Sequence, residues 1–172
     1  NAFTGIVRPS WNIGVNPNGG YLLTLAITAL HQAAPQHLDP LSITVHYLRP
    51  GLADQPCRID TQILRTGRTL TTARATLSQD GSARIEVLAA LGDLPEQADA
   101  VLSLPMPAMP PPDQCLDRSG AEQGVGLPIM ERLDIRLHPD EARAGTAGQA
   151  QVTGWIRFRD GRPPDTLASL LF

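Results

Sequence analysis

The segment Asn16-Pro17-Asn18-Gly19-Gly20-Tyr21, with the apolar run that follows it as far as Leu30, decides the fold of this chain. Pro17 and the glycines indicate a tight loop. Asn18 is a good helix N-cap, because its side chain can accept a hydrogen bond from a backbone N–H group one turn on. Apolar residues then recur every three or four positions, which is one face of a helix. Because the run carries no charge, we expect a central helix over about 19–34 that is buried nearly all round.

The start of this helix is also a candidate ligand site. Glycines let a ligand approach the backbone closely, and the free N–H groups and the helix dipole favour negative charge at that end. We therefore take Asn18, Gly19, Gly20 and Tyr21 as candidate substrate-binding residues. The same residues also fit a tight turn with a helix cap and no ligand.

Composition limits the class of protein. The 172 residues are 42% hydrophobic but only 4% aromatic, which allows one large domain or two small ones with an aliphatic core. A net charge of −3 without a basic run argues against nucleic-acid binding. No apolar run reaches the roughly 18 residues of a membrane helix, so we expect a cytoplasmic protein. The chain begins with Asn1 rather than Met, so we expect its natural start to lie upstream.

The two cysteines, Cys57 and Cys115, fit no metal-binding spacing. We expect free thiols in a reducing compartment, and no metal or cofactor. Cys57 is expected to be a small buried apolar residue rather than a nucleophile.

Residues that alternate in polarity predict four strands after the helix, at 41–48, 57–63, 70–78 and 83–91, and a short one before it at 3–7. Asp80-Gly81 is a strong hairpin turn, because both residue types tolerate positive φ. Thr66-Gly67-Arg68 is another short turn. Strands joined by such turns form an antiparallel meander.

Beyond Asp93 the composition changes. Five prolines between Leu104 and Asp113 predict an extended linker. Strands over 130–137 and 149–159 and a helix that starts after Asp165 then repeat the first half in outline. We therefore divide the chain into an N-terminal unit (1–94), a Pro/Gly-rich linker (95–127) and the start of a second unit (128–172).

Four motifs, in order and spacing, resemble the TesB-like acyl-CoA thioesterases, also described as acyl-CoA thioesterase II-like. Trp155-Ile156-Arg157-Phe158-Arg159-Asp160 is similar to the opening of that family's second half. The four motifs are Asn18-Gly19-Gly20-Tyr21, Leu41-Ser42-Ile43-Thr44-Val45-His46-Tyr47-Leu48-Arg49-Pro50, Leu64-Arg65-Thr66-Gly67-Arg68-Thr69-Leu70 and Ser78-Gln79-Asp80-Gly81.

The resemblance implies an α+β double hotdog fold, in which each unit is a long central helix wrapped by a curved antiparallel sheet. The second hotdog is begun but incomplete in these residues. It also implies a role in fatty acid metabolism. The implied reaction is the hydrolysis of fatty acyl-CoA to free acid and CoA, by water attack on a thioester held at a helix N-terminus. The catalytic Asp of the family is expected just after Phe172, with Thr and Gln partners further on, so no catalytic residue is assigned. Open sheet edges favour a homo-oligomer.

Several alternatives stay open. Arg68 is either a contact for a CoA phosphate or part of a solvated turn. His46 lies on the polar face of a strand, and His31, His37 and His138 are expected at the surface. The chain could also be a non-catalytic acyl-CoA-binding or assembly module, or an enoyl-thioester hydratase, which usually needs an Asp/His pair near the helix. An alanine- and leucine-rich helix indicates an apolar tunnel but not its depth.

Overall fold

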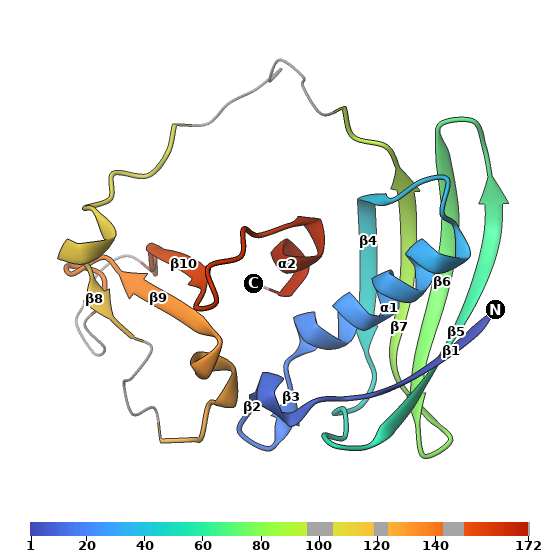
Figure 1. Ribbon diagram of the computed structural model, residues 1–172, viewed down its shortest axis with the longest axis horizontal. Coiled ribbons are helices and arrows are strands. Elements are labelled where there is room, and N and C mark those ends of the chain that lie inside the picture. The colour runs from blue at the N-terminus through green and yellow to red at the C-terminus, as the bar shows by residue number, and fades with distance from the viewer. Residues whose placement is uncertain (96–104, 119–123, 143–149, 172) are drawn as a thin grey trace.

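The computed structural model describes residues 1–95, 105–118, 124–142 and 150–171 (Figure 1). Its first half is one helix, α1 (Gly19–Ala33), wrapped by a five-stranded antiparallel sheet. This is the hotdog arrangement that the sequence predicts. The sheet has the order β1-β5-β6-β7-β4, and its strands are β1 (Ala2–Ile6), β4 (Asp39–Tyr47), β5 (Pro56–Thr66), β6 (Leu70–Gln79) and β7 (Ser82–Gly92).

The helix begins where the sequence places it. The Asn18 side chain accepts a hydrogen bond from the backbone N–H of Tyr21 at 2.9 Å, so Asn18 is the N-cap. At the other end the N–H of Ala34 donates to the carbonyl of Leu30, and Pro35 prevents further helix. The short elements before α1 are a 3-10 turn η1 (Pro9–Trp11) and two paired strands, β2 (Asn12–Ile13) and β3 (Asn16–Pro17).

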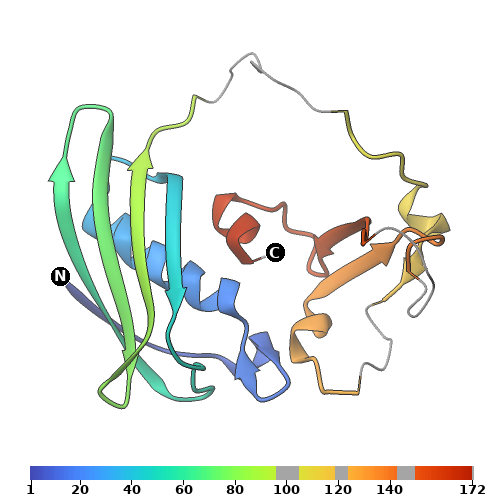
Figure 2. The same cartoon turned by 180° about the vertical axis from the view of Figure 1, so that it is seen from behind.

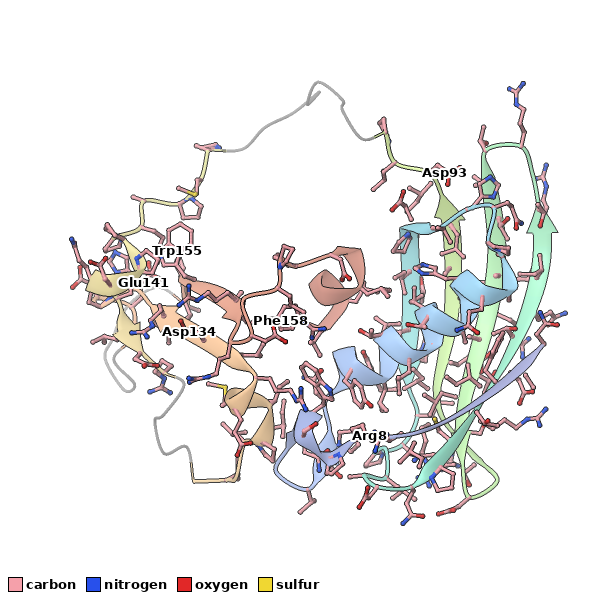
Figure 3. All side chains as sticks on the ribbon, in the orientation of Figure 1. Arg8, Asp93, Asp134, Glu141, Trp155 and Phe158 are labelled. Carbon is pink, nitrogen blue, oxygen red and sulfur yellow. The ribbon has the colours of Figure 1, made fainter. Side chains whose placement is uncertain are left out.

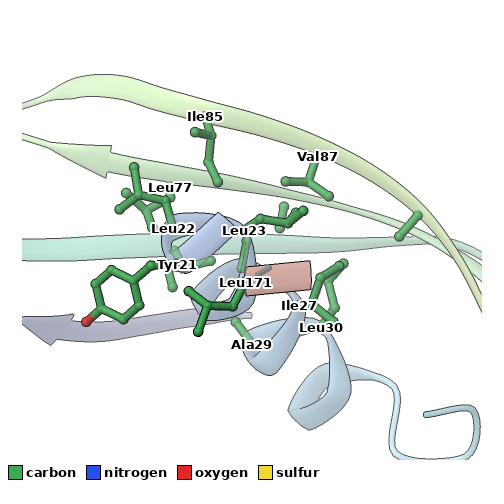
Figure 4. Packing of buried hydrophobic residues seen from close by; sticks show 14 of the residues in the cluster. Tyr21, Leu22, Leu23, Ile27, Ala29, Leu30, Leu77, Ile85, Val87 and Leu171 are labelled. Atoms are coloured by element: carbon green, nitrogen blue, oxygen red, sulfur yellow. The ribbon is translucent and has the colours of Figure 1, made fainter. Parts of the chain in front are cut away.

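The core lies between α1 and the concave face of the sheet (Figure 4). Leu22, Ile27 and Leu30 of the helix are almost fully buried. Strand β6, in the middle of the sheet, presents Ala73 and Ala75 to the core, and such small side chains let the helix approach closely. The β6–β7 hairpin turns at Asp80 and Gly81, with φ of 49° and 69°, as predicted.

Helix α1 is not buried all round, which corrects the sequence expectation. Thr24, Leu25 and Thr28 are half-buried and Gln32 is exposed. These residues recur at intervals of three or four, so they form one stripe of the helix. The reason is geometric: the sheet covers only one side of α1 (Figures 1 and 2).

The second half has a three-stranded antiparallel sheet of order β10-β9-β8, followed by α2 (Thr166–Leu171). Two short 3-10 turns, η2 (Pro112–Gln114) and η3 (Pro128–Glu131), precede its strands. This is compatible with the beginning of a second hotdog. The strands are β8 (Leu116–Asp117), β9 (Leu133–Leu137) and β10 (Gly154–Phe158).

The predicted linker is more structured than expected. Strand β8 falls within it and pairs with β9, and the indole N–H of Trp155 donates to the Pro110 carbonyl at 2.9 Å. The proline segment therefore packs on the second sheet. The predicted strand start at residue 149 and the linker residues 96–104 and 119–123 lie outside the described residues, and the domain boundaries stay predictions.

The described parts of the two halves are in contact around Trp11 and along α1. The Arg132 guanidinium lies 4.8 Å from the centre of the Trp11 ring and donates to the Ser10 hydroxyl at 2.9 Å. Helix α2 lies between the two sheets and packs on α1 (Figures 1 and 2). Among the described residues, the model contains no helix with the length and apolar character that a membrane crossing needs.

Candidate active site

The start of α1 retains two backbone donors. The Asn18 side chain accepts from the N–H of Tyr21, and the Asn18 carbonyl accepts from the N–H of Leu22 at 3.2 Å. The N–H groups of Gly19 and Gly20 have no hydrogen-bond partner among the residues that the structure describes. Together with the helix dipole, two such donors can stabilise an oxygen that carries negative charge.

Gly19 is also a packing position, because the ring of Tyr47 lies against it. A Cβ atom added to Gly19 would lie 2.9 Å from Cε1 of Tyr47, which is too close for any larger residue unless the ring moves. Tyr47 is half exposed at the end of the edge strand β4. Burial raises the pKa of its phenol, so this hydroxyl keeps its proton.

Gly20 is in contact with α2. A Cβ atom there would clash with the carbonyl oxygen of Leu170 and would lie 2.8 Å from that of Leu171. Gly20 therefore lets the backbones of the two helices approach closely. Whether Gly19 and Gly20 also contact a substrate stays a prediction.

Tyr21 is largely a structural residue. Its side chain is buried, its ring stacks on Trp11 with centroids 5.7 Å apart, and its hydroxyl accepts from the N–H of Arg8 at 3.1 Å. Tyr21 also forms one wall of a pocket, and its role in substrate binding stays a prediction.

That pocket, the junction pocket, has a volume of about 260 Å³ and lies where the two halves meet. Phe158, which extends from β10 towards α2, forms its far wall (Figure 3). The guanidinium of Arg162 lies over the Phe158 ring at 4.0 Å. The pocket is thus aromatic and aliphatic inside, with charged groups at its exposed margin. Its lining residues are Trp11, Tyr21, Thr24, Phe158, Arg162, Pro163, Asp165, Leu167 and Leu171.

Arg68 does not belong to this site. It lies in the turn between β5 and β6, where its carbonyl is 3.4 Å from Nε2 of His37, just beyond the C-terminal end of α1. The 15 residues of α1 span about 22 Å, so Arg68 is separated from Asn18 by the whole length of the helix. Its contact with a CoA phosphate stays a prediction.

The expectation of surface histidines is wrong for His37, which is buried at 4% exposure. Its Nδ1 lies 2.9 Å from the Thr71 hydroxyl, so it connects the end of α1 to strand β6. His31 is half-buried in the last turn of α1, and His46 is exposed, as expected. No spacing in the sequence could have signalled the His37–Thr71 pair, because the partners meet only through the tertiary fold.

Sequence reasoning also missed the ion cluster on the second sheet. Asp134 accepts from Nε of Arg136 at 2.8 Å and from Nε of Arg157 at 3.0 Å (Figure 3). Burial alone would raise the pKa of Asp134, but the two guanidinium groups outweigh it and hold this pKa below its usual value. A carboxylate paired in this way is a poor proton acceptor.

Comparisons with known proteins agree on one family. Residues 7–94 match the family model described as the acyl-CoA thioesterase N-terminal domain. A crystal structure from Thermobifida fusca, assigned as a thioesterase II, superposes with a TM-score of 0.86 at 30% identity, covering 99% of this chain and 66% of that one. The acyl-CoA thioesterase II of Mycobacterium marinum superposes with a TM-score of 0.70 at 25% identity, over 99% of this chain and 61% of that one.

A curated relative shows sequence similarity, but its name describes no function. An uncharacterized protein of Mycobacterium tuberculosis is 28% identical over an alignment 198 positions long, which includes 98% of this chain. The chain spans 65% of the length of that relative.

Proposed function

Because this chain belongs to the acyl-CoA thioesterase family, we propose that it acts in the hydrolysis of fatty acyl-CoA thioesters, with the thioester carbonyl held at the start of α1. The products are a free acid and CoA. Water attacks the carbonyl carbon, negative charge develops on the carbonyl oxygen, and the C–S bond then breaks to release the CoA thiol.

One observation carries this proposal: the N–H groups of Gly19 and Gly20 have no hydrogen-bond partner in the described part of the chain. They are fixed by the Asn18 cap and by packing against Tyr47 and α2, so they need no rearrangement as charge develops. Donors held in place in this way stabilise the transition state more than the ground state.

The direction of α2 supports the same site. Leu167 lies beside Thr24 and Leu171 beside Gly20, so α2 runs antiparallel to α1 and towards its N-terminus. A carboxylate just after Phe172, on a continuation of α2, would come close to Asn18 and could act as the general base for the water. The resemblance to the family implies a catalytic Asp at about this position, and we propose that it is this base.

The test compares two substitutions of the N-cap in the complete protein. Asn18→Ser and Asn18→Asp both keep a capping oxygen, so both should keep the helix. Only Asn18→Asp adds a negative charge where the carbonyl oxygen becomes negative. We expect kcat for acyl-CoA hydrolysis, measured by trapping the released CoA thiol, to fall at least about tenfold in Asn18→Asp relative to Asn18→Ser.

Equal kcat values in the two variants would rule out the start of α1 as the carbonyl site. If the unmodified protein binds acyl-CoA without releasing CoA, a non-catalytic binding module replaces the proposal. Formation or loss of an alkene in the acyl chain would instead indicate a hydratase.

A further inference from the structure

Two pockets lie along the side of α1 that its sheet leaves uncovered. The junction pocket uses Tyr21 and Thr24, and a second pocket uses the next turns of the same stripe, Leu25, Thr28 and Gln32. The stripe from Thr24 to Gln32 is about 12 Å long at the helical rise per residue. The two pockets therefore follow each other along one face of the helix.

The second pocket, which we call the edge pocket, lies between α1 and the edge strand β1. It has a volume of about 210 Å³ and includes Phe3 and Ile6 of β1 and Cys57 and Ile59 of β5. At the roughly 30 Å³ that a water molecule occupies in the liquid, it has room for about seven non-hydrogen atoms. All of its described lining residues, from Phe3 to Ile59, belong to the N-terminal hotdog.

The chemistry of the edge pocket is apolar. None of the described residues that line it is charged. The Thr28 hydroxyl donates to the Thr24 carbonyl at 2.8 Å, and the Thr24 hydroxyl donates to the Gly20 carbonyl at 2.9 Å. Because these hydroxyls are satisfied inside the helix, they demand no polar partner from a ligand. Burial raises the pKa of the Cys57 thiol, which therefore remains neutral.

We infer that the edge pocket receives the distal part of a linear acyl chain, and that the stripe of α1 guides the chain there from the junction pocket. This inference rests on the proposed function, and it makes the edge pocket the determinant of acyl chain length. A chain that ends in the junction pocket gains nothing from the edge pocket, whereas a longer chain buries its last methylene groups there.

Gly5 offers a direct test, because its missing side chain leaves the edge pocket open. Gly5 pairs with Cys57 across β1 and β5, and a Cβ atom on Gly5 would meet only the Cys57 sulfur at an ordinary 3.8 Å. Gly5→Val and Gly5→Leu should therefore fill the pocket progressively without backbone strain. Ala2→Leu adds the same side chain to the other face of β1 from Gly5, at a position that does not line the edge pocket, and is the matched control.

The experiment measures kcat/KM for straight-chain acyl-CoAs from acetyl-CoA to palmitoyl-CoA. We expect the ratio of palmitoyl-CoA to butyryl-CoA hydrolysis to fall about tenfold or more in Gly5→Leu, and less in Gly5→Val, because one methylene group in an apolar pocket is already worth a factor of this size. Ala2→Leu should leave the ratio unchanged. Thermal unfolding of each variant verifies that it is folded.

A chain-length profile that is the same in Gly5→Leu and in Ala2→Leu overturns the inference. If that profile is unchanged while light scattering shows a different oligomeric mass, the edge pocket is a contact between copies of this chain, and the inference is likewise overturned. If no thioester is hydrolysed at all, the proposed function fails, but the acyl pocket can still be tested by calorimetric binding of dodecanoate. Weaker binding by Gly5→Leu than by Ala2→Leu supports the acyl pocket, and equal binding contradicts it.

Discussion

Gly20 of α1 and Leu171 of α2 lie with their backbones in contact, so closely that a Cβ atom on Gly20 would be 2.9 Å from the Leu171 Cα atom. One turn along, the Thr24 hydroxyl lies 3.4 Å from the Leu167 carbonyl. The first turns of α1 thus pack antiparallel against α2, with the end of α2 at Gly20 and its beginning at Thr24, and this contact joins the two halves of the chain. Leu171 completes the core cluster around α1 (Figure 4).

Gly20→Ala should destabilise the protein by about 1–3 kcal/mol, because the added methyl group meets backbone atoms that cannot rotate away. Gly19→Ala is the matched control. Its methyl group meets the half-exposed ring of Tyr47, which can rotate, and alanine is the better helix former by about 1 kcal/mol. Urea unfolding checks both, and a larger loss in Gly19→Ala than in Gly20→Ala would contradict the assignment of the helix contact.

The cluster of Asp134, Arg136 and Arg157 gives a second prediction. Asp134 is nearly buried and makes charged hydrogen bonds to both arginines. Asp134→Asn keeps the size but removes the charge, and we expect a loss of about 1–3 kcal/mol in the free energy of unfolding. The low pKa of Asp134 means that its contribution is present above the pKa of the unfolded state and is lost as the pH falls through the folded-state pKa.

An exposed ion pair with the same spacing is the control. Arg58 and Asp60 pair at 2.7 Å on strand β5, but both side chains are about half exposed or more. Surface pairs of this kind contribute little. Asp60→Asn should leave the urea midpoint unchanged, and a loss equal to that of Asp134→Asn would mean that the burial of Asp134 does not matter.

Most of the first hotdog could be predicted from local signals. The Asn18 cap, the period of α1 and the Asp80-Gly81 turn each act within a few residues, and the structure has all three. The position of β4 beside β7, at the sheet edge, was not predicted. Alternation of polarity tells which face of a strand is buried but not which strands are neighbours.

The candidate site was predictable to a smaller extent. The sequence identified the start of α1, but not that Tyr21 would be held by Trp11 and Arg8, nor that Arg68 would lie at the opposite end of the helix. These relationships depend on segments far apart in the chain. The sequence did not predict the uncovered stripe of α1. Threonine is neither strongly apolar nor charged, so its presence does not tell whether a sheet covers that face of the helix.

Tyr21 and Trp11 give a third prediction, on the base of the junction pocket. Tyr21→Phe keeps the stack on Trp11 but removes the acceptor for the Arg8 N–H, so we expect a loss of about 1 kcal/mol. Tyr21→Ala also removes the ring from the core and should lose about 3–5 kcal/mol, as other aromatic truncations do. Chemical denaturation separates the two, and equal losses would show that the ring contributes nothing beyond its hydroxyl.

His31 gives the last prediction, a dependence of stability on pH. Its Nε2 is enclosed and has no hydrogen-bond partner among the described residues, so protonation would bury a charge. Burial lowers the pKa of His31 below its usual 6.5, although the Asp39 carboxylate and the Leu38 backbone oppose the shift. The unfolded chain therefore binds a proton more readily than the folded one.

Since the folded-state pKa is the lower of the two, the contribution of neutral His31 to stability is fully present above pH 6.5 and is lost as the pH falls from 6.5 through the folded-state pKa. His31→Gln does not titrate, so its free energy of unfolding should fall less over this range than that of the unmodified protein. Urea unfolding at several pH values on both sides of 6.5 measures the difference. An identical fall in the two proteins would mean that protonation of His31 is not coupled to unfolding, and that the enclosed Nε2 finds a partner, such as an ordered water molecule, when it becomes charged.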